Sequence, residues 1–326
     1  MANIKTGITL FSLGTAFVRR EMDFEDCVRA AAEMGAEGYE IVASESIPSY
    51  PYISDEFLGL VERCKDKYGI APSCYAAQMD RGMLKDRDLT EDEMVARAIT
   101  DVISANKLGC TVMREQYLLS PQGLERLAPY AELYNVRVGI EIHNPESPIT
   151  PAMLDYLEMI ERTGSKYVGF IPDFGCFATG PNKPIWDRAL AGGASVEQLE
   201  RCAKLKYEEV PKEEALKIME EECRKTPALS DAINSFYGFV QFKKSIKKEL
   251  KGLKHIMPYC FEMHGKFHYV DENLHEPAIP YEEIIPVIAE TGFNGYIMTE
   301  YEDEGGYDAI EQCTRHIAMM KKIMNQ

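Results

Sequence analysis

Short apolar runs alternate with longer segments of helical period along the whole chain. Eight of these runs predict β-strands, over residues 7–13, 38–42, 71–76, 110–115, 136–143, 167–174, 256–264 and 295–302. The segments between them open on an acidic, hydroxyl or proline residue, and most close on glycine or asparagine, which are start and stop signals of helices. Helices are predicted over residues 23–35, 54–69, 90–109, 121–135, 150–164, 279–292 and 307–324.

The order of the predicted elements indicates the fold class. Strands that alternate with helices form a parallel sheet, because parallel neighbours need a long return connection. Eight such units in 326 residues predict an α/β fold of the (β/α)8 TIM barrel type, as a single domain over residues 1–326. A doubly wound open sheet is the competing architecture, but no GxGxxG motif follows the first strand and the strands number eight rather than five or six.

One segment interrupts this regular order. Residues 177–252, between the sixth and seventh predicted strands, are far longer than a single connection requires and contain several polar helical stretches. Connections of this length are usually functional or carry structure of their own. The sequence therefore predicts a helical insertion at about 177–252 that covers the active site or holds a partner.

Acidic and imidazole side chains stand where several predicted strands end, and in a TIM barrel these ends line the active site. Strand five ends with Glu141 and His143, strand six with Asp173, strand seven with His264 and strand eight with Glu300. One such residue alone is more often a solvated loop residue, but consecutive strand ends favour a shared site. Clustered carboxylates repel one another unless a cation is bound. Oxygen ligands with one imidazole suit Mn2+, Mg2+ or Co2+, so a divalent metal site is predicted.

Three further residues are candidates for substrate binding. Arg114 ends the fourth predicted strand and could hold a substrate oxygen or pair with a neighbouring carboxylate. Lys266 is similarly placed, and His268 lies close enough along the chain to reach the site. The sequence places His255 and His316 on helical surfaces or helix ends, where a solvated side chain is expected.

The charge of the chain limits its partners. There are 53 acidic and 36 basic side chains, with a net charge of −17, which disfavours nucleic acid and anionic membrane surfaces. No stretch approaches the roughly 20 apolar residues of a membrane span. Nine cysteines without regular spacing indicate reduced thiols, and together these features predict a cytoplasmic protein.

The constellation resembles the xylose isomerase-like TIM barrels, a superfamily of sugar isomerases and epimerases, over nearly the whole chain. Glu141 in GIEIHN, Asp173 in IPDFG, His264 in EMHGKF and Glu300 in MTEYE fall where that superfamily places its metal ligands. The resemblance implies that Glu141 and Glu300 also exchange a substrate proton. The superfamily commonly has histidine three residues after the aspartate, whereas this chain has Cys176, so a substrate contact is missing or replaced.

Three features make the chain most similar to the alpha (large) subunits of bacterial C-glycoside deglycosidases: His143, the insertion, and the run HGKFHYVDENLHEPAIPYEEIIP. This resemblance implies a manganese-dependent lyase that cleaves the carbon–carbon bond of a 3-oxo-C-glycoside and assembles with a smaller beta subunit as a hetero-oligomer. A ketone at sugar carbon 3 acidifies the hydrogen on carbon 2, and expulsion of the group on carbon 1 frees the aglycone. We expect His143 to be the general base, or else a further metal ligand or a residue that orients Glu141.

Two other activities are compatible with the same residues. A sugar isomerase or epimerase, either a ketose 3-epimerase or an aldose–ketose isomerase, would begin with the same proton abstraction and return the proton to the substrate. A metal-dependent phosphodiesterase acting on abasic DNA would use the same barrel, as endonuclease IV does. The negative charge and the lack of additional metal-binding histidines disfavour the phosphodiesterase.

Overall fold

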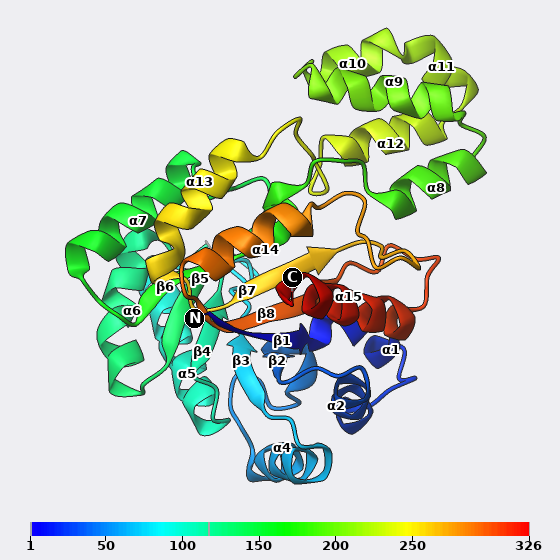
Figure 1. Ribbon diagram of the computed structural model, residues 1–326. Helices are drawn as coiled ribbons and strands as arrows, with labels where there is room; N and C mark the ends of the chain where they lie inside the picture. Colours follow the sequence, from blue (N-terminus) through cyan, green and yellow to red (C-terminus); the bar gives the residue numbers. More distant parts are fainter. Residues whose placement is uncertain (1, 117, 326) are drawn as a thin grey trace.

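The computed structural model describes residues 2–116 and 118–325. In this part of the chain, eight parallel strands form one sheet in the order β6-β5-β4-β3-β2-β1-β8-β7. Helices surround the sheet on its outer side (Figure 1). The fold is the predicted (β/α)8 TIM barrel. The strands are β1 Asn3–Thr9, β2 Tyr39–Val42, β3 Pro72–Ala76, β4 Val112–Glu115, β5 Arg137–Ile142, β6 Val168–Pro172, β7 Met263–Phe267 and β8 Asn294–Tyr301.

The seven predicted helices begin and end within two residues of their predicted bounds. They are α2 Phe24–Glu33, α4 Asp55–Tyr68, α5 Glu91–Lys107, α6 Pro121–Leu133, α7 Pro151–Thr163, α14 Tyr281–Glu290 and α15 Ala309–Met324. Three further helices of the barrel had no predicted bounds, α1 Gly14–Val18, α3 Ala43–Ser46 and α13 Lys247–Ile256. Thr90 and Glu93 form a capping box at the start of α5, which satisfies backbone donors of its first turn. Gly69 and Gly164 end α4 and α7 in the left-handed conformation that glycine adopts without strain.

The barrel closes between β6 and β7 through isolated bridges. Phe170 pairs with Cys260, and Asp173 pairs with His264. Gly169 permits the close approach of the chain that leads into β7, since a Cβ atom there would lie 2.1 Å from the Tyr259 carbonyl oxygen. The strands of a barrel are staggered along its axis. As a result, the residue just after β6 lies level with the second residue of β7.

Two predicted strands were wrong in their bounds. In the first apolar run the strand ends at Thr9, and the rest of the run forms a 3-10 helix, η1 Leu10–Leu13. The side-chain oxygen of Thr9 caps this helix by accepting a hydrogen bond from the Phe11 amide. The apolar run before His264 forms the end of α13 and a second 3-10 helix, η3 Met257–Tyr259, with proline in its first turn. Strand β7 therefore begins only at Met263, and His264 lies near its start rather than at its end.

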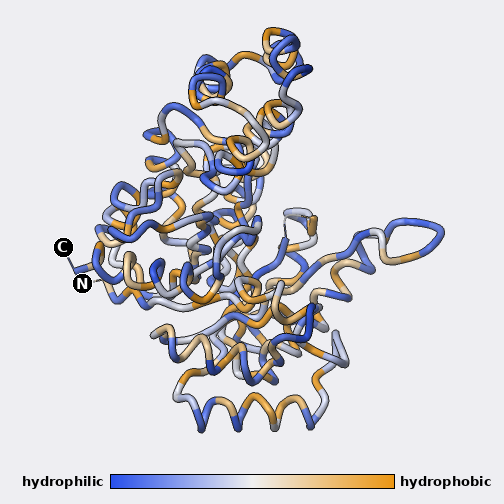
Figure 2. The backbone as a smooth tube through the Cα atoms, turned by 90° about the vertical axis from the view of Figure 1, so that its right-hand side faces the viewer, coloured by the Kyte–Doolittle hydropathy of each residue, from blue (hydrophilic) through white to orange (hydrophobic). Residues whose placement is uncertain are grey.

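The chain between β6 and β7 carries a helical lobe, as predicted. After the 3-10 helix η2 Phe174–Phe177 come α8 Lys183–Ala191, α9 Val196–Tyr207, α10 Lys212–Ile218, α11 Glu220–Lys225 and α12 Ala228–Phe236. These five helices stand beyond the barrel at the top of Figure 1. Hydrophobic and hydrophilic positions are mixed along them, as in amphipathic helices that pack on one another (Figure 2). The bounds of the insertion as a unit, about 177–252, stay a prediction.

The segment that leads back from the lobe to the barrel, residues 237–246, is called the returning loop below. It connects α12 to α13 and passes over the C-terminal ends of the strands. No helix in the described ranges combines the length and the apolar character needed to cross a membrane.

The prediction of a solvated His316 was wrong, whereas His255 is exposed as expected. His316 in α15 is fully buried, and its ring stacks on Phe267 with the ring centroids 4.0 Å apart. Its Nδ1 atom lies 3.0 Å from the Thr299 hydroxyl oxygen. Burial lowers the pKa of His316 to about 3, so the ring is neutral in the folded protein.

Candidate active site

His264 lies at the centre of a buried cluster of carboxylates inside the barrel. Its Nδ1 atom is 3.0 Å from Oε1 of Glu141 on β5 and 3.4 Å from Oε1 of Glu300 on β8. Potential ligand atoms of these three residues, called the outer group below, all lie within 4.8 Å of one another. Burial lowers the pKa of His264, but Glu40 and Glu300 outweigh this effect and raise the pKa well above its usual value.

Asp173, the fourth predicted metal ligand, is not part of the outer group. Its Oδ1 atom accepts a hydrogen bond from the Gly175 amide, and its Oδ2 atom lies 2.8 Å from Nζ of Lys266. Burial raises the pKa of Asp173 despite the nearby Lys266. Asp173 is therefore held beside the cluster by an ammonium group rather than directly by His264.

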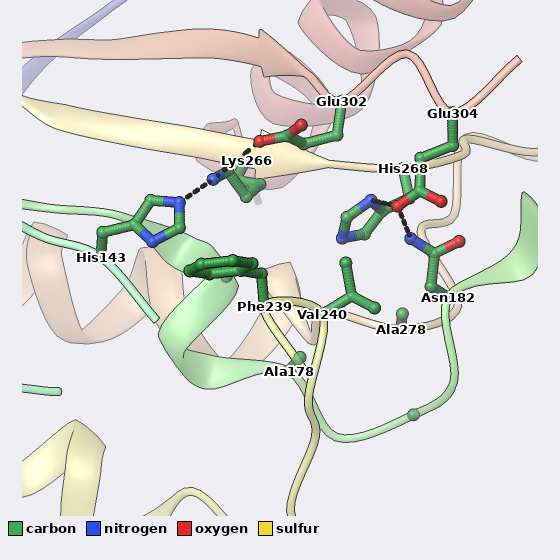
Figure 3. Close-up of a pocket in the computed structure, with 12 residues that line it drawn as sticks. His143, Ala178, Asn182, Phe239, Val240, Lys266, His268, Ala278, Glu302 and Glu304 are labelled. Atoms are coloured by element: carbon green, nitrogen blue, oxygen red, sulfur yellow. Dashed lines mark hydrogen bonds and ion pairs between the residues drawn. The ribbon is translucent and has the colours of Figure 1, made fainter. Parts of the chain in front are cut away.

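Lys266 joins several of the predicted site residues. Its Nζ atom lies 2.8 Å from Nε2 of His143 and 2.9 Å from Oε1 of Glu302 (Figure 3). It also lies 3.9 Å from Oε2 of Glu300. Burial alone lowers the pKa of Lys266, but Asp173 and Glu300 raise it well above its usual value, so the group is a cation. Lys266 is thus the positive charge around which these groups meet.

The orientation of His143 follows from its hydrogen bonds. Its Nδ1 atom lies 2.7 Å from the backbone carbonyl oxygen of Asn144, which can only accept a hydrogen bond, so Nδ1 carries the hydrogen. The other nitrogen, Nε2, then presents its lone pair and accepts a hydrogen bond from Lys266. This arrangement leaves the basic nitrogen of His143 directed at Lys266 and Asp173.

The remaining candidates lie on two sides of the cluster. Nη1 of Arg114 lies 3.4 Å from Oε2 of Glu141, one of the two arrangements expected for this arginine. Burial raises the pKa of Glu141, but Arg114 and His264 outweigh it and hold that pKa well below its usual range. His268 is buried just after β7, and its Nδ1 atom lies 3.8 Å from Oε1 of Glu304. Burial lowers the pKa of His268 to about 4.

A cavity of about 160 Å³ opens beside this cluster. Its walls come from the barrel and from the returning loop, and its lining residues include His143, Lys266, His268, Glu302 and Phe239. Phe239 is 75% exposed although it is a large apolar side chain, and its ring packs edge-on against His143 with centroids 6.2 Å apart (Figure 3). The cavity thus combines a polar floor with an aromatic edge.

Asn144 attaches the returning loop to the barrel. Its side-chain Nδ2 atom lies 3.2 Å from the Phe239 carbonyl oxygen, 3.1 Å from that of Gln241 and 3.3 Å from that of Gly175. Asn144 is buried and follows His143 directly. Asn144, which holds the loop that carries Phe239, is therefore adjacent in sequence to His143, which the Phe239 ring contacts.

Cys176 does not replace the histidine that the superfamily commonly has at this position. It is buried in the hydrophobic core, and its thiol donates a hydrogen bond to the Asp173 carbonyl oxygen over 2.8 Å. Burial raises the pKa of this thiol well above its usual value. Cys176 is also not among the residues that line the cavity.

The outer group fits a divalent cation. It offers carboxylate oxygens and one imidazole nitrogen, a donor set that suits Mn2+, Mg2+ and Co2+. Oε2 of Glu300 is buried without a hydrogen-bond partner among the described residues, which costs free energy unless something binds it. The roles of the single residues stay predictions.

Sequence reasoning missed two carboxylates at the cluster. Glu40 on β2 lies 3.1 Å from Nε2 of His264, and Glu302 follows β8 and pairs with Lys266. Glu40 is the second residue of its strand, away from the strand ends on which the prediction rested. Glu302 is the last residue of the predicted eighth strand, but the prediction took Glu300 instead. A charged residue within the buried run GYEIV was the available signal, because a carboxylate in a parallel strand needs a partner.

Comparison with known proteins identifies the fold family. The family model for the xylose isomerase-like TIM barrel matches residues 28–323. Among solved structures, D-psicose 3-epimerase from Clostridium cellulolyticum H10 superposes with a TM-score of 0.56 at 13% identity, covering 98% of this chain and 97% of that one. At this identity the likeness shows the fold alone.

Relatives of known activity are nearer in sequence. The 3'-dehydrocarminate deglycosidase alpha subunit of a Microbacterium species is 30% identical over 308 residues, 91% of this chain and 88% of that protein. A C-glycoside deglycosidase alpha subunit of Arthrobacter globiformis is 28% identical over 333 residues, 100% of this chain and 94% of that protein. The chain therefore belongs to the xylose isomerase-like TIM barrel family and is a relative of the deglycosidase alpha subunits within it.

Proposed function

We propose that the protein is the alpha subunit of a metal-dependent lyase that cleaves the carbon–carbon bond of 3-oxo-C-glycosides. The observation that carries the proposal is the tautomer of His143: Nδ1 carries the hydrogen, so Nε2 is its basic nitrogen, and the residue lines the cavity beside the outer group. Nε2 accepts a hydrogen bond from Lys266 in the structure, and its lone pair can take a proton from a bound substrate once Lys266 moves away from it. The names of the relatives support the same reaction class.

The outer group would hold the metal, with Asp173 as a further ligand once Lys266 moves away from it. A divalent cation, which we propose is Mn2+, would supply a Lewis acid for the ketone oxygen at sugar carbon 3. Arg114 keeps Glu141 ionised, which favours binding of a cation by that carboxylate. Lys266 and His268 line the cavity and are placed to donate hydrogen bonds to substrate oxygens.

The elimination balances within the substrate and the protein. Nε2 of His143 takes the proton from sugar carbon 2, and the electron pair of that bond forms the double bond between carbons 1 and 2. The bond from carbon 1 to the aglycone breaks, and its electron pair leaves with the aglycone carbon, which takes up one proton. No oxidant or reductant is consumed, because the proton lost at carbon 2 balances the proton gained by the aglycone.

The exposed ring of Phe239 at the cavity edge favours a substrate with an aromatic aglycone. A large apolar ring that is 75% exposed at a cavity edge gains contact area when a flat ring packs against it. The edge-on contact with His143 places this ring next to the proposed base. A sugar alone would leave Phe239 without a comparable partner.

A second candidate is a sugar isomerase or epimerase. Glu141 and Glu300 both face Nδ1 of His264 from different strands, a pairing that would also suit proton exchange by two carboxylates. This activity would proceed without bond cleavage, and the protein would work alone. The alpha-subunit names of the relatives favour the lyase with a beta partner.

Product analysis separates the two candidates. The protein, with Mn2+ and a co-expressed small subunit, is incubated with a 3-oxo-C-glycoside, and the free aglycone is measured by chromatography. Release of aglycone that His143→Ala abolishes and the exposed-site control His255→Ala preserves supports the lyase. Epimerised or isomerised free sugar with solvent deuterium at one carbon, and no aglycone, assigns the second activity instead.

A further inference from the structure

Glu40 is a carboxylate inside the barrel that the proposed reaction does not use. It lies on β2 and is fully buried, and its Oε2 atom is 3.1 Å from Nε2 of His264. The two residues are 224 positions apart in the sequence and meet only because the barrel closes. A buried carboxylate costs several kcal/mol unless it is paired. The contact with His264 is the largest of the interactions that compensate for its burial, and Arg114 and Thr9 add to it.

The two ring nitrogens of His264 face different partners. Nδ1 faces the carboxylates of Glu141 and Glu300, whereas Nε2 faces Glu40. A metal binds the lone pair of an unprotonated imidazole nitrogen. If the outer group holds the metal through Nδ1, the hydrogen of the neutral ring must therefore be on Nε2, where it points at Oε2 of Glu40.

A second set of ligand atoms competes with this arrangement. Glu40, Glu262 and His264, called the inner group here, also bring three ligand atoms within 4.8 Å of one another. A metal in the inner group would bind Nε2 and leave Nδ1 to the outer carboxylates.

Access to the cavity favours the outer group. Lys266 lines the cavity and lies 3.9 Å from Glu300, so the outer group adjoins the space that a substrate can enter. No residue of either group lines this cavity directly. Glu300 of the outer group nevertheless adjoins the lining residue Lys266, whereas the hydrogen bond and ion pair of Glu40 run to His264, away from the lining.

We propose that Glu40 is a positioning residue that holds the hydrogen of His264 on Nε2 and thereby leaves Nδ1 free for the metal. This inference rests on the metal-dependent function proposed above and adds to it the residue that sets which nitrogen binds. Glu40 contacts neither the substrate nor the metal in this arrangement. Removing the hydrogen-bond partner of a metal-binding histidine typically lowers the metal affinity by about 10-fold to 100-fold.

Metal titrations of purified protein test this role without any substrate. Mn2+ affinity is measured by competition with a metal-sensitive dye for the unmodified protein, Glu40→Gln, Glu40→Leu and the matched control Glu262→Gln. We expect Glu40→Leu to bind Mn2+ about 10-fold to 100-fold more weakly. Glu40→Gln should lose less, because its amide oxygen still accepts the hydrogen bond from Nε2. Glu262→Gln should stay within about twofold, well below that range.

Two results would overturn the role of Glu40 alone. One is an unchanged Mn2+ affinity in both Glu40 variants with circular dichroism that shows intact folding. The other is a loss in Glu262→Gln as large as in Glu40→Leu, which assigns the metal to the inner group. Failure of the unmodified protein to bind Mn2+ at all would instead overturn the metal-dependent function together with this inference.

A measurement on the unmodified protein keeps the test valid if a variant fails to fold. Nitrogen-15 spectra of the histidine rings report which nitrogen carries the hydrogen, with Zn2+ as a diamagnetic probe and His264→Gln to assign the signal. We expect His264 to show hydrogen on Nε2 and zinc on Nδ1. The opposite pattern, hydrogen on Nδ1 and zinc on Nε2, would contradict the proposal.

Discussion

The Nζ atom of Lys266 lies 2.8 Å from Oδ2 of Asp173 and thereby places an ammonium group against a predicted metal ligand. The same ammonium is 2.8 Å from Nε2 of the proposed base, His143. A cation in this position compensates for the charge of the carboxylates. It also repels a second cation nearby, so binding of a metal and the position of Lys266 are coupled.

Replacing Lys266 with methionine tests this coupling. We expect Mn2+ to bind about threefold to tenfold more tightly, up to about 1.4 kcal/mol, because a competing positive charge is removed. Turnover should fall, since the substrate loses a proposed contact. Dye competition and aglycone release measure the two effects. Weaker Mn2+ binding in the variant would mean that Lys266 instead holds Asp173 in a binding position.

The roles of His143 and His264 separate in a comparison of metal content with turnover. We expect His264→Ala to lose the metal, whereas His143→Ala keeps it and turns over about 10²-fold to 10⁴-fold more slowly, as for loss of a general base. Elemental analysis of the purified variants measures the metal. Asp173→Ala should also lose metal if Asp173 completes the ligand set. Equal metal loss in His143→Ala would make His143 a ligand.

Phe239 should distinguish aromatic glycosides from free sugars. We expect Phe239→Ala to raise KM for an aromatic 3-oxo-C-glycoside by about 2-fold to 10-fold, because an aromatic contact of 0.5 to 1.5 kcal/mol is lost. Thermal stability should stay unchanged, since the ring is 75% exposed. Leu133→Ala, an exposed apolar residue on α6, is the matched control. Equal KM values in Phe239→Ala and the control would remove Phe239 from the substrate contacts.

His316 should make the folded state sensitive to acid. Its pKa in the folded protein is about 3, below the unfolded value near 6.5, so the unfolded state binds the extra proton. Its contribution to stability is present above pH 6.5 and decreases as the pH falls from 6.5 towards 3. The decrease is at most about 1.4 kcal/mol per pH unit.

Urea unfolding at pH 7.5 and pH 5.0 measures this effect. We expect the difference in the free energy of unfolding between the two pH values to be smaller in His316→Phe than in the unmodified protein. Phenylalanine can keep the stacking contact with Phe267 but cannot bind a proton. The exposed control His255→Gln should leave the difference unchanged. A variant as sensitive to acid as the parent would assign the effect to other groups.

The barrel and its helices could be predicted from the sequence because each element carries its own signals. Strand β5 follows from an apolar β-branched run, and α5 from the capping residues at its start. The bounds of strand β7 could not be predicted in this way, because the apolar residues before it form the end of α13 and the 3-10 helix η3. Sequence periodicity reports burial, and a buried helix end and a buried strand look alike over a few residues.

The site was predictable only in part, because the stagger of the strands is a property of the closed barrel. His264 lies near the start of β7 and still reaches Glu141 and Glu300, since β7 is displaced along the axis relative to β6. Glu40 was missed for the same reason, as it lies low on β2 but level with His264. The burial of His316 was missed because a histidine on an amphipathic helix is expected on its solvated face. In the structure the rings of Phe267 and Tyr281 cover it.

The amide of Asn144 has two hydrogens but three carbonyl oxygens within reach, from Gly175, Phe239 and Gln241. One acceptor is always left over, so the bonds can pass from one carbonyl to another without all being broken at once. Two of the three carbonyl oxygens, those of Phe239 and Gln241, belong to the returning loop. The attachment of this loop to the barrel therefore does not depend on any single hydrogen bond.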